Sequence, residues 1–320
     1  MPSPEWIVER GIGETRAALV EDGEIIEARI ELDGTVRAGT VIRARLVNNG
    51  VNGRNAIAVG EGGAEYLLRS GAPKITQGAT VAIEVTRETI PGAEPWKLAL
   101  ARLTDKAPAA PPALGGRKLA FPSPRDELAE FGWKDLVDQA RTGVAPFAGG
   151  ELRISPTPAM TLIDVDGYLA PDELAVLGAG EASSAIRRLD IGGSIGIDLP
   201  TVRSKAARQA AAQAIDTALN QPFERTGVNG FGFVQIVRPR IRASLVELAL
   251  DRAPFEARAL MRRAAQEGPG AKCLVARPDV IAVLEDHPEW LEVLGRQVGG
   301  AISLRRDANL SISGGHAEAP

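Results

Sequence analysis

The sequence predicts a multidomain protein of mixed class, α+β and α/β, with an OB-type β-barrel followed by an α/β layered domain. Short strand-like segments separated by Gly-rich turns fill residues 37–104, and a Pro/Ala-rich linker comes next. Strands then alternate with helices from residue 149 to the end, which is the pattern of layered α/β structure. A length of 320 residues leaves room for two or three domains.

Composition limits the chemistry that is open to the chain. The hydrophobic fraction of 44% is that of a globular protein, and a net charge of −4 neither indicates nor excludes nucleic-acid binding, because local basic patches matter more. Cys273 is the single cysteine, so an internal disulfide and a Cys-based zinc site within one chain are excluded. Because neither a signal peptide nor a membrane-spanning run is recognisable, we expect a cytoplasmic protein without membrane association.

Residues 1–36 are predicted to form a β-hairpin region. Apolar runs at 6–8 and 17–20 predict two strands, and a third is expected at 25–30. The turn before the third strand carries Asp22-Gly23, a pair that is typical of tight hairpins.

The region 37–104 contains five short strand patterns. They are expected at Thr40–Val47, Ala56–Val59, Glu65–Leu68, Thr80–Arg87 and Lys97–Leu103. Apolar and polar residues alternate from Val41 to Leu46, so one face of this strand should be buried and the other exposed. Five such strands in about 70 residues are typical of a small OB-type barrel.

Residues 105–148 are predicted to be a linker with one short helix. The Pro/Ala-rich stretch 106–112 is expected to hold neither a strand ladder nor a helix. The helix is expected at Pro124–Ala140, with Ser123 as its cap.

The remaining chain divides into an α/β domain at 149–250 and a small C-terminal α/β domain at 251–320. In the first, strands are expected at Glu151–Ile154, Met160–Val165, Ser194–Leu199 and Gly232–Val237, and helices at Pro171–Leu189 and Thr201–Asn220. Gly178 and Gly180 are expected to interrupt or bend the first helix. The last residues, Ser313–Pro320, are expected to be frayed.

Two acid-bearing strand ends carry the clearest chemical signal. Asp164 and Asp166 lie two residues apart and therefore share one face of their strand, and Asp198 ends a second strand. Ligands of open α/β sheets bind at the carboxyl ends of strands. Neighbouring carboxylates there suit Mg²⁺ and phosphate chemistry. The alternative is a helix cap or a surface turn, above all for Asp166, which precedes Gly167.

Several segments, in order, resemble the ribonuclease E/G family. Residues 149–166 resemble its first catalytic segment, 187–198 its second, 232–245 the strand and basic segment that follow, and 14–23 its opening hairpin. The resemblance implies an RNase H-like remnant at 1–36, an S1-like RNA-binding barrel at 37–104 and a DNase I-like catalytic domain at 149–250. It covers most of the chain, but the family's separate domain that senses a 5′-monophosphate is missing.

By this resemblance, Asp164 and Asp198 are the catalytic residues and the ligands of Mg²⁺. Asp166 stands where the family usually has Asn, and its carboxylate would be a further metal ligand. The family pairs its subunits, which implies a homodimer. Cys273 lies away from the family's zinc link, so no zinc-linked tetramer is expected.

RNA is the expected partner, held in single-stranded form by basic and aromatic side chains. Arg43 and Arg45 share one side of a barrel strand, and Arg238, Arg240 and Arg242 alternate on one face beside the acids. The other candidates are Arg54, Tyr66, Arg87, Trp96 and Lys97. An ordinary solvated strand face is the alternative for the barrel arginines.

The sequence thus predicts a Mg²⁺-dependent endoribonuclease that cleaves single-stranded RNA in processing or decay. The main alternative is a catalytically impaired RNA- or ribosome-binding protein of the same family. A metal-dependent phosphohydrolase acting on small substrates is a third possibility, but it leaves the barrel unexplained.

Overall fold

The chain folds into two compact units, and each is assembled from segments that are far apart in the sequence. The structure is a computed structural model that describes residues 3–50, 55–91 and 97–320. One unit comprises Met1–Asp33, Gly115–Thr142 and Leu248–Pro320, and the other comprises Gly34–Leu114 and Gly143–Glu247. Within the described ranges, none of the helices is both long enough and apolar enough to cross a membrane.

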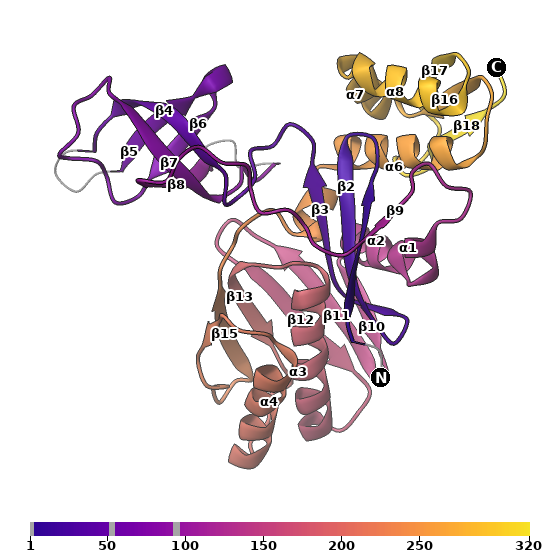
Figure 1. Ribbon diagram of the computed structural model, residues 1–320. Coiled ribbons are helices and arrows are strands. Elements are labelled where there is room, and N and C mark those ends of the chain that lie inside the picture. Colours follow the sequence, from indigo (N-terminus) through magenta and orange to yellow (C-terminus); the bar gives the residue numbers. More distant parts are fainter. Residues whose placement is uncertain (1–2, 51–54, 92–96) are drawn as a thin grey trace. The chain divides into compact units, whose positions relative to one another are not determined.

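Five strands of the second unit form a closed barrel (Figure 1). They are β4 (Val41–Asn48), β5 (Ala56–Gly60), β6 (Glu65–Leu68), β7 (Thr80–Arg87) and β8 (Ala99–Leu103), with the 3-10 turn η2 (Glu61–Gly63) after β5. The barrel closes in the order β4-β5-β6-β8-β7. Along β4, Ala44 and Leu46 enter the core while Arg43 and Arg45 stay exposed. A closed barrel of five strands agrees with the predicted OB-type fold.

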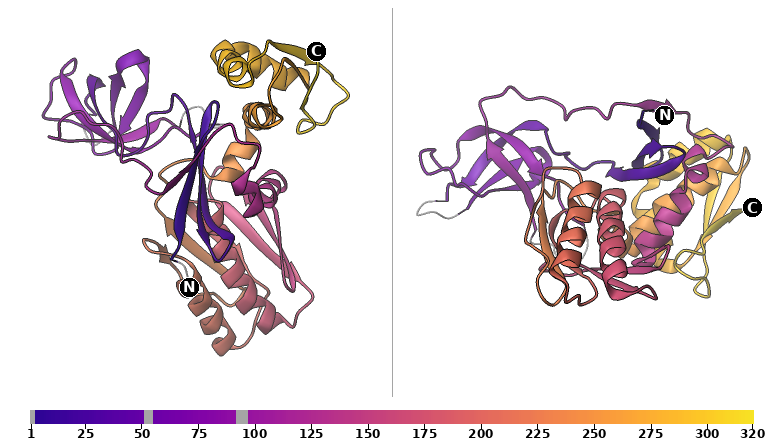
Figure 2. Two further views of the ribbon diagram at one scale, coloured as in Figure 1. Left: turned by 45° about the vertical axis from the view of Figure 1, so that its right-hand side comes forward. Right: turned by 90° about the horizontal axis from the view of Figure 1, so that it is seen from below.

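The second unit also contains a six-stranded sheet in the order β10-β11-β12-β13-β15-β14. Its strands are β10 (Val144–Phe147), β11 (Gly150–Pro156), β12 (Thr161–Gly167), β13 (Gly193–Asp198), β14 (Glu224–Arg225) and β15 (Phe233–Arg238). The central strands β12 and β13 run parallel, and the other neighbours in the sheet are antiparallel. Helices α3 (Pro171–Arg188) and α4 (Lys205–Ala218) lie side by side against this sheet (Figure 2). The predicted alternation of strands and helices is therefore present.

Helix α3 packs unusually close to β12 because a glycine lies at the contact. A Cβ atom added to Gly178 would lie 2.3 Å from Cγ1 of Val165. The helix is continuous across this residue, so the predicted interruption at Gly178 and Gly180 is wrong. Tertiary packing outweighs the low helix propensity of glycine here. The face of β12 that carries Ile163 and Val165 is buried as a result.

The first unit is built around a four-stranded sheet in the order β3-β2-β1-β9. Its strands are β1 (Glu5–Arg10), β2 (Glu14–Glu21), β3 (Glu24–Leu32) and β9 (Arg117–Leu119). The predicted turn is confirmed, because Asp22 and Gly23 both have positive φ angles, of 49° and 85°. Strand β9 belongs to the segment predicted as a linker and pairs in parallel with β1.

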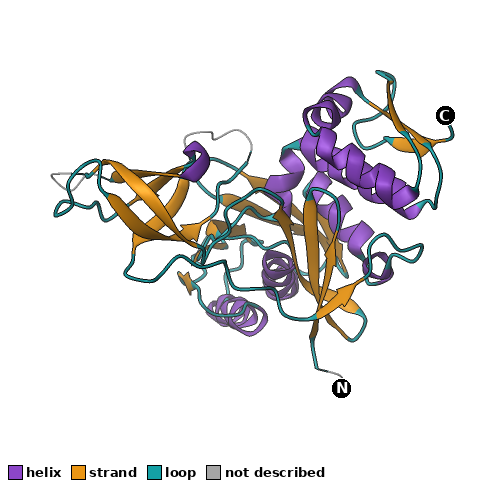
Figure 3. Ribbon diagram, turned by 45° about the horizontal axis from the view of Figure 1, so that its top comes forward, coloured by secondary structure: helices purple, strands orange, loops and turns teal. Residues whose placement is uncertain are grey.

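Helices and a small three-stranded sheet complete the first unit (Figure 3). The elements are α1 (Glu127–Glu130), α2 (Trp133–Thr142), α6 (Arg252–Gln266), β16 (Lys272–Ala276), α7 (Pro278–Asp286), α8 (Pro288–Val298), β17 (Ile302–Arg306) and β18 (His316–Glu318), and α5 (Leu245–Leu250) precedes α6. Leu260, Leu274 and Leu284 are fully buried in one apolar cluster, which joins α6, β16 and α7.

Three boundaries differ from those predicted. The helix expected at 124–140 is two helices, and Asp126 rather than Ser123 caps the first by accepting a hydrogen bond from the backbone N–H of Ala129. Helix α4 is capped by Ser204 and begins four residues after the predicted Thr201. The terminal segment predicted to be frayed contains β18, which pairs with β16. Ser and Asp are equally favoured as cap residues, so the sequence did not decide between Ser123 and Asp126, whereas Ser204 is a better cap than Thr201.

We expect the substitution Gly178→Ala to destabilise the second unit. The new methyl group would overlap Val165, and overpacking of this kind costs about 1–3 kcal/mol. The matched control is Gly180→Ala in the same helix, where an added Cβ meets nothing within 4 Å and should raise stability by up to about 1 kcal/mol. Thermal unfolding midpoints of both variants test this, and a midpoint for Gly178→Ala at or above that of the wild type would contradict it.

Candidate functional site

Two carboxylates face each other across the parallel pair of strands in the six-stranded sheet. Asp164 of β12 is the register partner of Asp198 of β13. Neighbouring strands lie about 5 Å apart, so the two side chains start from adjacent points on the same sheet face. Both residues are exposed, whereas Ile163 and Ile197 beside them are completely buried. The predicted pairing of Asp164 with Asp198 at one sheet edge is therefore what the strand register produces.

Other charged side chains share this exposed sheet face. On β11, Arg153 is the register partner of Asp164, and Glu151 is the partner of Asp166. Arg153 forms an ion pair of 2.5 Å with Glu151. Asp166 lies two residues beyond Asp164, or about 7 Å further along β12. The face thus carries four carboxylates and one guanidinium within two rows of the sheet.

The charges on this face raise the pKa of Asp164. Partial burial of its carboxyl group is the largest cause, followed by the nearby charges of Asp166 and then of Asp198. The backbone N–H of Val165 and the charge of Arg153 act in the opposite direction but do not cancel the rise. A cation placed between these carboxylates would relieve the part of the rise that comes from their mutual repulsion.

The geometry fits a metal held by two carboxylates rather than by three. Mg²⁺ is commonly bound by one or two carboxylates at about 2.1 Å and completes its shell with water and phosphate oxygens. Among the residues that the structure describes, no group of three or more His, Cys, Asp or Glu side chains is arranged to hold a metal ion. Asp166 lies one row further along the sheet than the Asp164–Asp198 pair, and its role as a further metal ligand stays a prediction.

Two exposed aromatic residues lie on loops next to strands of this sheet, and the sequence did not suggest a role for either. Tyr168 follows the end of β12 and is 84% exposed, and Phe231 precedes β15 and is 82% exposed. The loop that carries Phe231 is held beside the end of β13, because Thr201 donates a hydrogen bond to the carbonyl of Phe231. Single exposed apolar side chains are common on protein surfaces, so it is the place of these two on loops, next to Gly167 and Gly232, that makes them candidates.

A basic pocket of 920 Å³ lies between the barrel and the sheet within the second unit. Four of the predicted RNA-binding residues line it together, namely Arg87, Lys97, Arg238 and Arg240. Arg69 and Phe223 line it as well and were not predicted, and Glu224 is the one acid in its wall among the described residues. We call this pocket the basic groove. It collects cations that are more than 100 residues apart in the sequence.

The arginines of the basic groove are held by contacts with the protein. Arg87 donates a hydrogen bond to the carbonyl of Leu98, and Arg238 donates one to the carbonyl of Ile191. Arg240 forms an ion pair with Glu247. These contacts fix the guanidinium groups in place, which lowers the entropy lost when they bind a ligand.

Arg242 lies beside the groove rather than in it. It pairs with Asp190 at 2.9 Å, and its Nε lies 3.9 Å from Glu88 of the barrel. Arg238, Arg240 and Arg242 line a second, smaller pocket of 150 Å³ together, although only Arg238 belongs to a strand.

Three other candidates do not join this site. Tyr66 is 2% exposed and packs in the barrel core, where burial also raises the pKa of its hydroxyl group, so it is wrong as a base-stacking residue. Arg43 and Arg45 are exposed on β4 but do not line the basic groove. Arg54 and Trp96 lie outside the described residues.

Comparison with known proteins finds a partial similarity to ribonuclease G. Ribonuclease G of Haemophilus influenzae is 33% identical to this chain over 119 residues, and ribonuclease G of Escherichia coli K12 is 30% identical over 119 residues. The matched proteins are ribonucleases. The match covers 33% of this chain and 24% of each relative, and no family model matches the chain. The similarity is therefore distant and partial, and it suggests the ribonuclease E/G family without extending to the whole chain.

We expect removal of a neighbouring negative charge to lower the pKa of Asp164, by an amount that depends on which acid is removed. Asp166→Asn should lower it more than Asp198→Asn, because the charge of Asp166 is the larger of the two causes. Arg153→Gln should raise the pKa, because Arg153 stabilises the ionised form. Carboxyl-carbon NMR titration of Asp164 in each variant tests this, and a rise after either Asp→Asn change would refute it.

The same shift makes stability depend on pH in a defined direction. Because the pKa of Asp164 is higher in the folded chain than its ordinary value of 3.8, the folded state holds this proton more tightly than the unfolded state. The ionised carboxylate therefore opposes folding at neutral pH, and this effect disappears as the pH falls through the folded pKa. Asp164→Asn should raise the unfolding midpoint at pH 7 and give no gain below about pH 3.

Proposed function

We propose that this protein is a metal-dependent endoribonuclease that acts on single-stranded RNA. The proposal rests chiefly on the register that sets Asp164 directly opposite Asp198 on an exposed sheet face. The basic groove in the same unit and the partial similarity to ribonuclease G support it. Each feature alone is compatible with other functions, but the three together favour cleavage of a phosphodiester chain.

Asp164 and Asp198 would hold a Mg²⁺ ion between them. Two carboxylates that start from adjacent strands can each supply one oxygen to a single ion with bonds of about 2.1 Å. Such an ion, when bound, activates a water molecule and offsets the negative charge of the phosphate. Asp166 and Glu151 are placed one row further along the sheet, where they add negative charge near the ion.

The basic groove would hold the phosphates of the RNA chain. The groove reaches Ser194 of β13, and Ser194 and Asp198 share one face of this strand. They are four residues apart, which corresponds to about 13 Å. An RNA strand that leaves the groove along β13 would therefore reach the acids within a short distance, and the rigid sheet would set this spacing.

Tyr168 and Phe231 would stack on unpaired bases beside the scissile phosphate. An exposed aromatic ring that stacks on a base contributes about 1–3 kcal/mol and accepts any base. Bases inside a duplex are not available for such contacts, so the two rings would favour single-stranded over double-stranded RNA. The cytoplasmic location and the homodimer implied by the family resemblance remain predictions.

A second function is favoured by one observation. The acids on the sheet outnumber the cations there, and no three-acid metal group forms among the described residues. Without a tightly bound metal, these carboxylates would repel a phosphate rather than attack it. The protein would then bind RNA or the ribosome through the basic groove and would not cleave.

The decisive measurement is cleavage of a labelled single-stranded RNA in the presence of Mg²⁺. Asp164→Asn and Asp198→Asn should each reduce the rate at least about a hundredfold, because each removes a metal ligand. The matched control is Asp172→Asn, which removes an acid in the first turn of α3 and should leave the rate unchanged. Equal rates in all four proteins would refute the metal site. Tight RNA binding by a wild type that does not cleave would favour the second function.

RNA binding should depend on salt through the basic groove. Arg69→Gln and Lys97→Gln should each weaken binding to single-stranded RNA several-fold, and each should reduce the slope of log K against log [salt] by about 0.7. Lys74→Gln removes an exposed lysine of the barrel that does not line the groove, so it should change neither quantity. Arg45→Gln tests whether RNA binds to the exposed face of β4 rather than to the basic groove. A loss of RNA affinity as large as that of Lys97→Gln would assign RNA binding to β4.

A further inference from the structure

The open face of the six-stranded sheet carries an apolar step between the basic groove and the acidic pair. Gly196 of β13 belongs to this face, because it lies two residues before Asp198, yet it is buried. Two side chains of the neighbouring strands cover it. A Cβ atom added to Gly196 would lie 2.6 Å from Cζ of Phe233 and 3.0 Å from Cδ2 of Leu162. The glycine therefore leaves room for a ring and an aliphatic chain, Phe233 and Leu162, which we call the apolar step.

Strand register fixes the position of the apolar step. Phe233 of β15 is the register partner of Asp198. Leu162 of β12 is the register partner of Gly196, one row nearer to the basic groove. Ser194, in the wall of the groove, lies two residues before Gly196, or about 7 Å away. The groove, the apolar step and the acids therefore follow one another along β13 at intervals of about 7 Å.

The row of β11, β12, β13 and β15 that contains Gly196 is made of uncharged residues. Ser155 is the register partner of Leu162, and Gln235 is the partner of Gly196. A phosphate would find no cation in this row, whereas a flat apolar group would bury its surface against Phe233 and Leu162. Phe233 is half-buried and Leu162 is 39% exposed, so part of each side chain is open to a ligand.

A nucleobase is the chemical group that suits this position. Phosphates of a bound strand would lie in the basic groove and at the acids, so the nucleotide between them would pass over the apolar step. Bases of a single strand are free to turn out of the strand and stack on aromatic side chains. The base of that nucleotide would therefore lie against the ring of Phe233 while its phosphates contact the charged rows.

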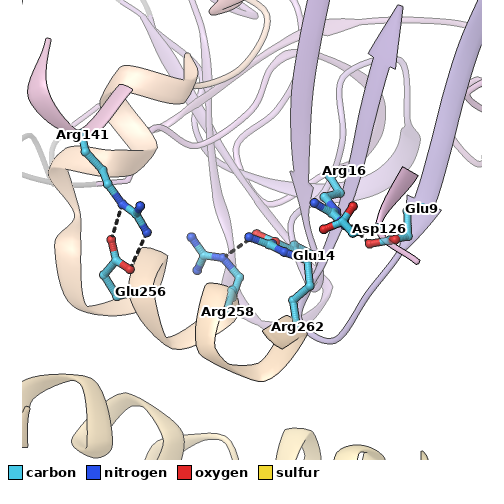
Figure 4. Close-up of polar contacts among 8 residues, drawn as sticks. All are labelled: Glu9, Glu14, Arg16, Asp126, Arg141, Glu256, Arg258 and Arg262. Carbon is cyan, nitrogen blue, oxygen red and sulfur yellow. Dashed lines mark hydrogen bonds and ion pairs between the residues drawn. The ribbon is translucent and has the colours of Figure 1, made fainter. Parts of the chain in front are cut away.

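A cluster of arginines in the first unit is, by contrast, already neutralised by acids (Figure 4). The ion pairs join Arg16 to Glu9 and Asp126, Arg141 to Glu256, and Glu14 to both Arg258 and Arg262. Because each arginine here has an acid partner, the cluster has little charge left with which to attract the phosphates of RNA. The basic groove is the better candidate for the phosphates, and the apolar step lies beside it.

We propose that Phe233 and Leu162 form a subsite for one unpaired nucleobase, on the groove side of the Asp164–Asp198 pair. Phe233 provides the stacking face, Leu162 extends it, and Gly196 provides the space in which the ring lies. The subsite rests on the proposed function in one respect, namely that the ligand is single-stranded RNA, and it does not require cleavage.

The subsite would define how a strand lies across the acids. Tyr168 and Phe231 lie beyond the acids, after the end of β12 and before the start of β15. Phe233 lies on the other side, toward the groove. Bases on both sides of the phosphate at the acids would then be held by aromatic rings, which would place that phosphate between two fixed points.

Binding of two single-stranded probes to the full chain in EDTA tests the proposal. One probe is a short RNA, and the other is an abasic ribose-phosphate strand of the same length, which carries the same phosphates. Phe233→Leu should weaken binding of the RNA about fivefold, because a base loses its stacking partner, and binding of the abasic strand by less than about twofold. An equal loss for both strands, or no loss for either, would overturn the proposal.

Salt dependence separates a contact with a base from a contact with a phosphate. Phe233→Leu should leave the slope of log K against log [salt] unchanged, because the ring neutralises no phosphate. A fall in this slope of about 0.7, as expected for Lys97→Gln, would show that a phosphate contact has been lost and would overturn the assignment.

A second variant and a matched control assign the effect to the apolar step. Gly196→Ala keeps the ring but places a methyl group 2.6 Å from it, so the ring must shift and affinity for the RNA should fall as it does in Phe233→Leu. Phe147→Leu makes the same change on the covered face of the same sheet, two residues after the buried Ala145, and should alter binding of neither strand. Phe233→Leu gives the test even if Gly196→Ala fails to fold.

The same measurements distinguish failure of the subsite from failure of the proposed nuclease. A wild type that never cleaves, but whose preference for the RNA over the abasic strand depends on Phe233, would refute only the nuclease. A wild type that cleaves RNA, with a preference that is the same in Phe233→Leu, would refute only the subsite. Failure of the wild type to bind either strand would refute both.

Discussion

The parallel pairing of β12 with β13 is the constraint on which the candidate active site depends. One register places Ile163 beside Ile197 on the covered face and Asp164 beside Asp198 on the open face. A slip of β12 by one residue would bury Asp164 and expose Ile163, so hydrophobic burial fixes the pairing of the acids. The same energy that forms the core of the sheet thus brings together two groups that repel each other. Packing of α3 against β12 through Gly178 reinforces this register.

Local sequence signals predicted the parts of the fold that local physics decides. Asp22-Gly23 forms the expected turn because both residues adopt positive φ, and the alternation from Val41 to Leu46 correctly placed Arg43 and Arg45 outside the barrel. Tyr66 was placed wrongly because β6 has only four residues, too few for a periodic pattern to show which side is inside. Barrel closure, a tertiary event, decides this.

The acids of the candidate site could be predicted from the sequence, but the residues around them could not. Asp164 and Asp198 lie at the ends of apolar runs, which is a signal that a single strand carries. The basic groove joins Arg69 of the barrel to Phe223 near β14, and no local pattern relates residues so far apart in the chain. The position of Phe233 over Gly196 is likewise visible only once β13 and β15 have paired.

The two units are interleaved along the chain, which passes from one to the other four times. The N-terminal sheet shares its unit with Leu248–Pro320, and the core of that unit includes Ile12 together with Leu274 and Leu294. The apolar surface of the N-terminal sheet is therefore fully covered only after Leu248–Pro320 has been made and has joined the same unit. The barrel and the six-stranded sheet can fold earlier, as an insertion that matures while its host is still incomplete. The unit that contains β1, β2 and β3 is thus completed last, and the apolar surface of these strands stays uncovered until then.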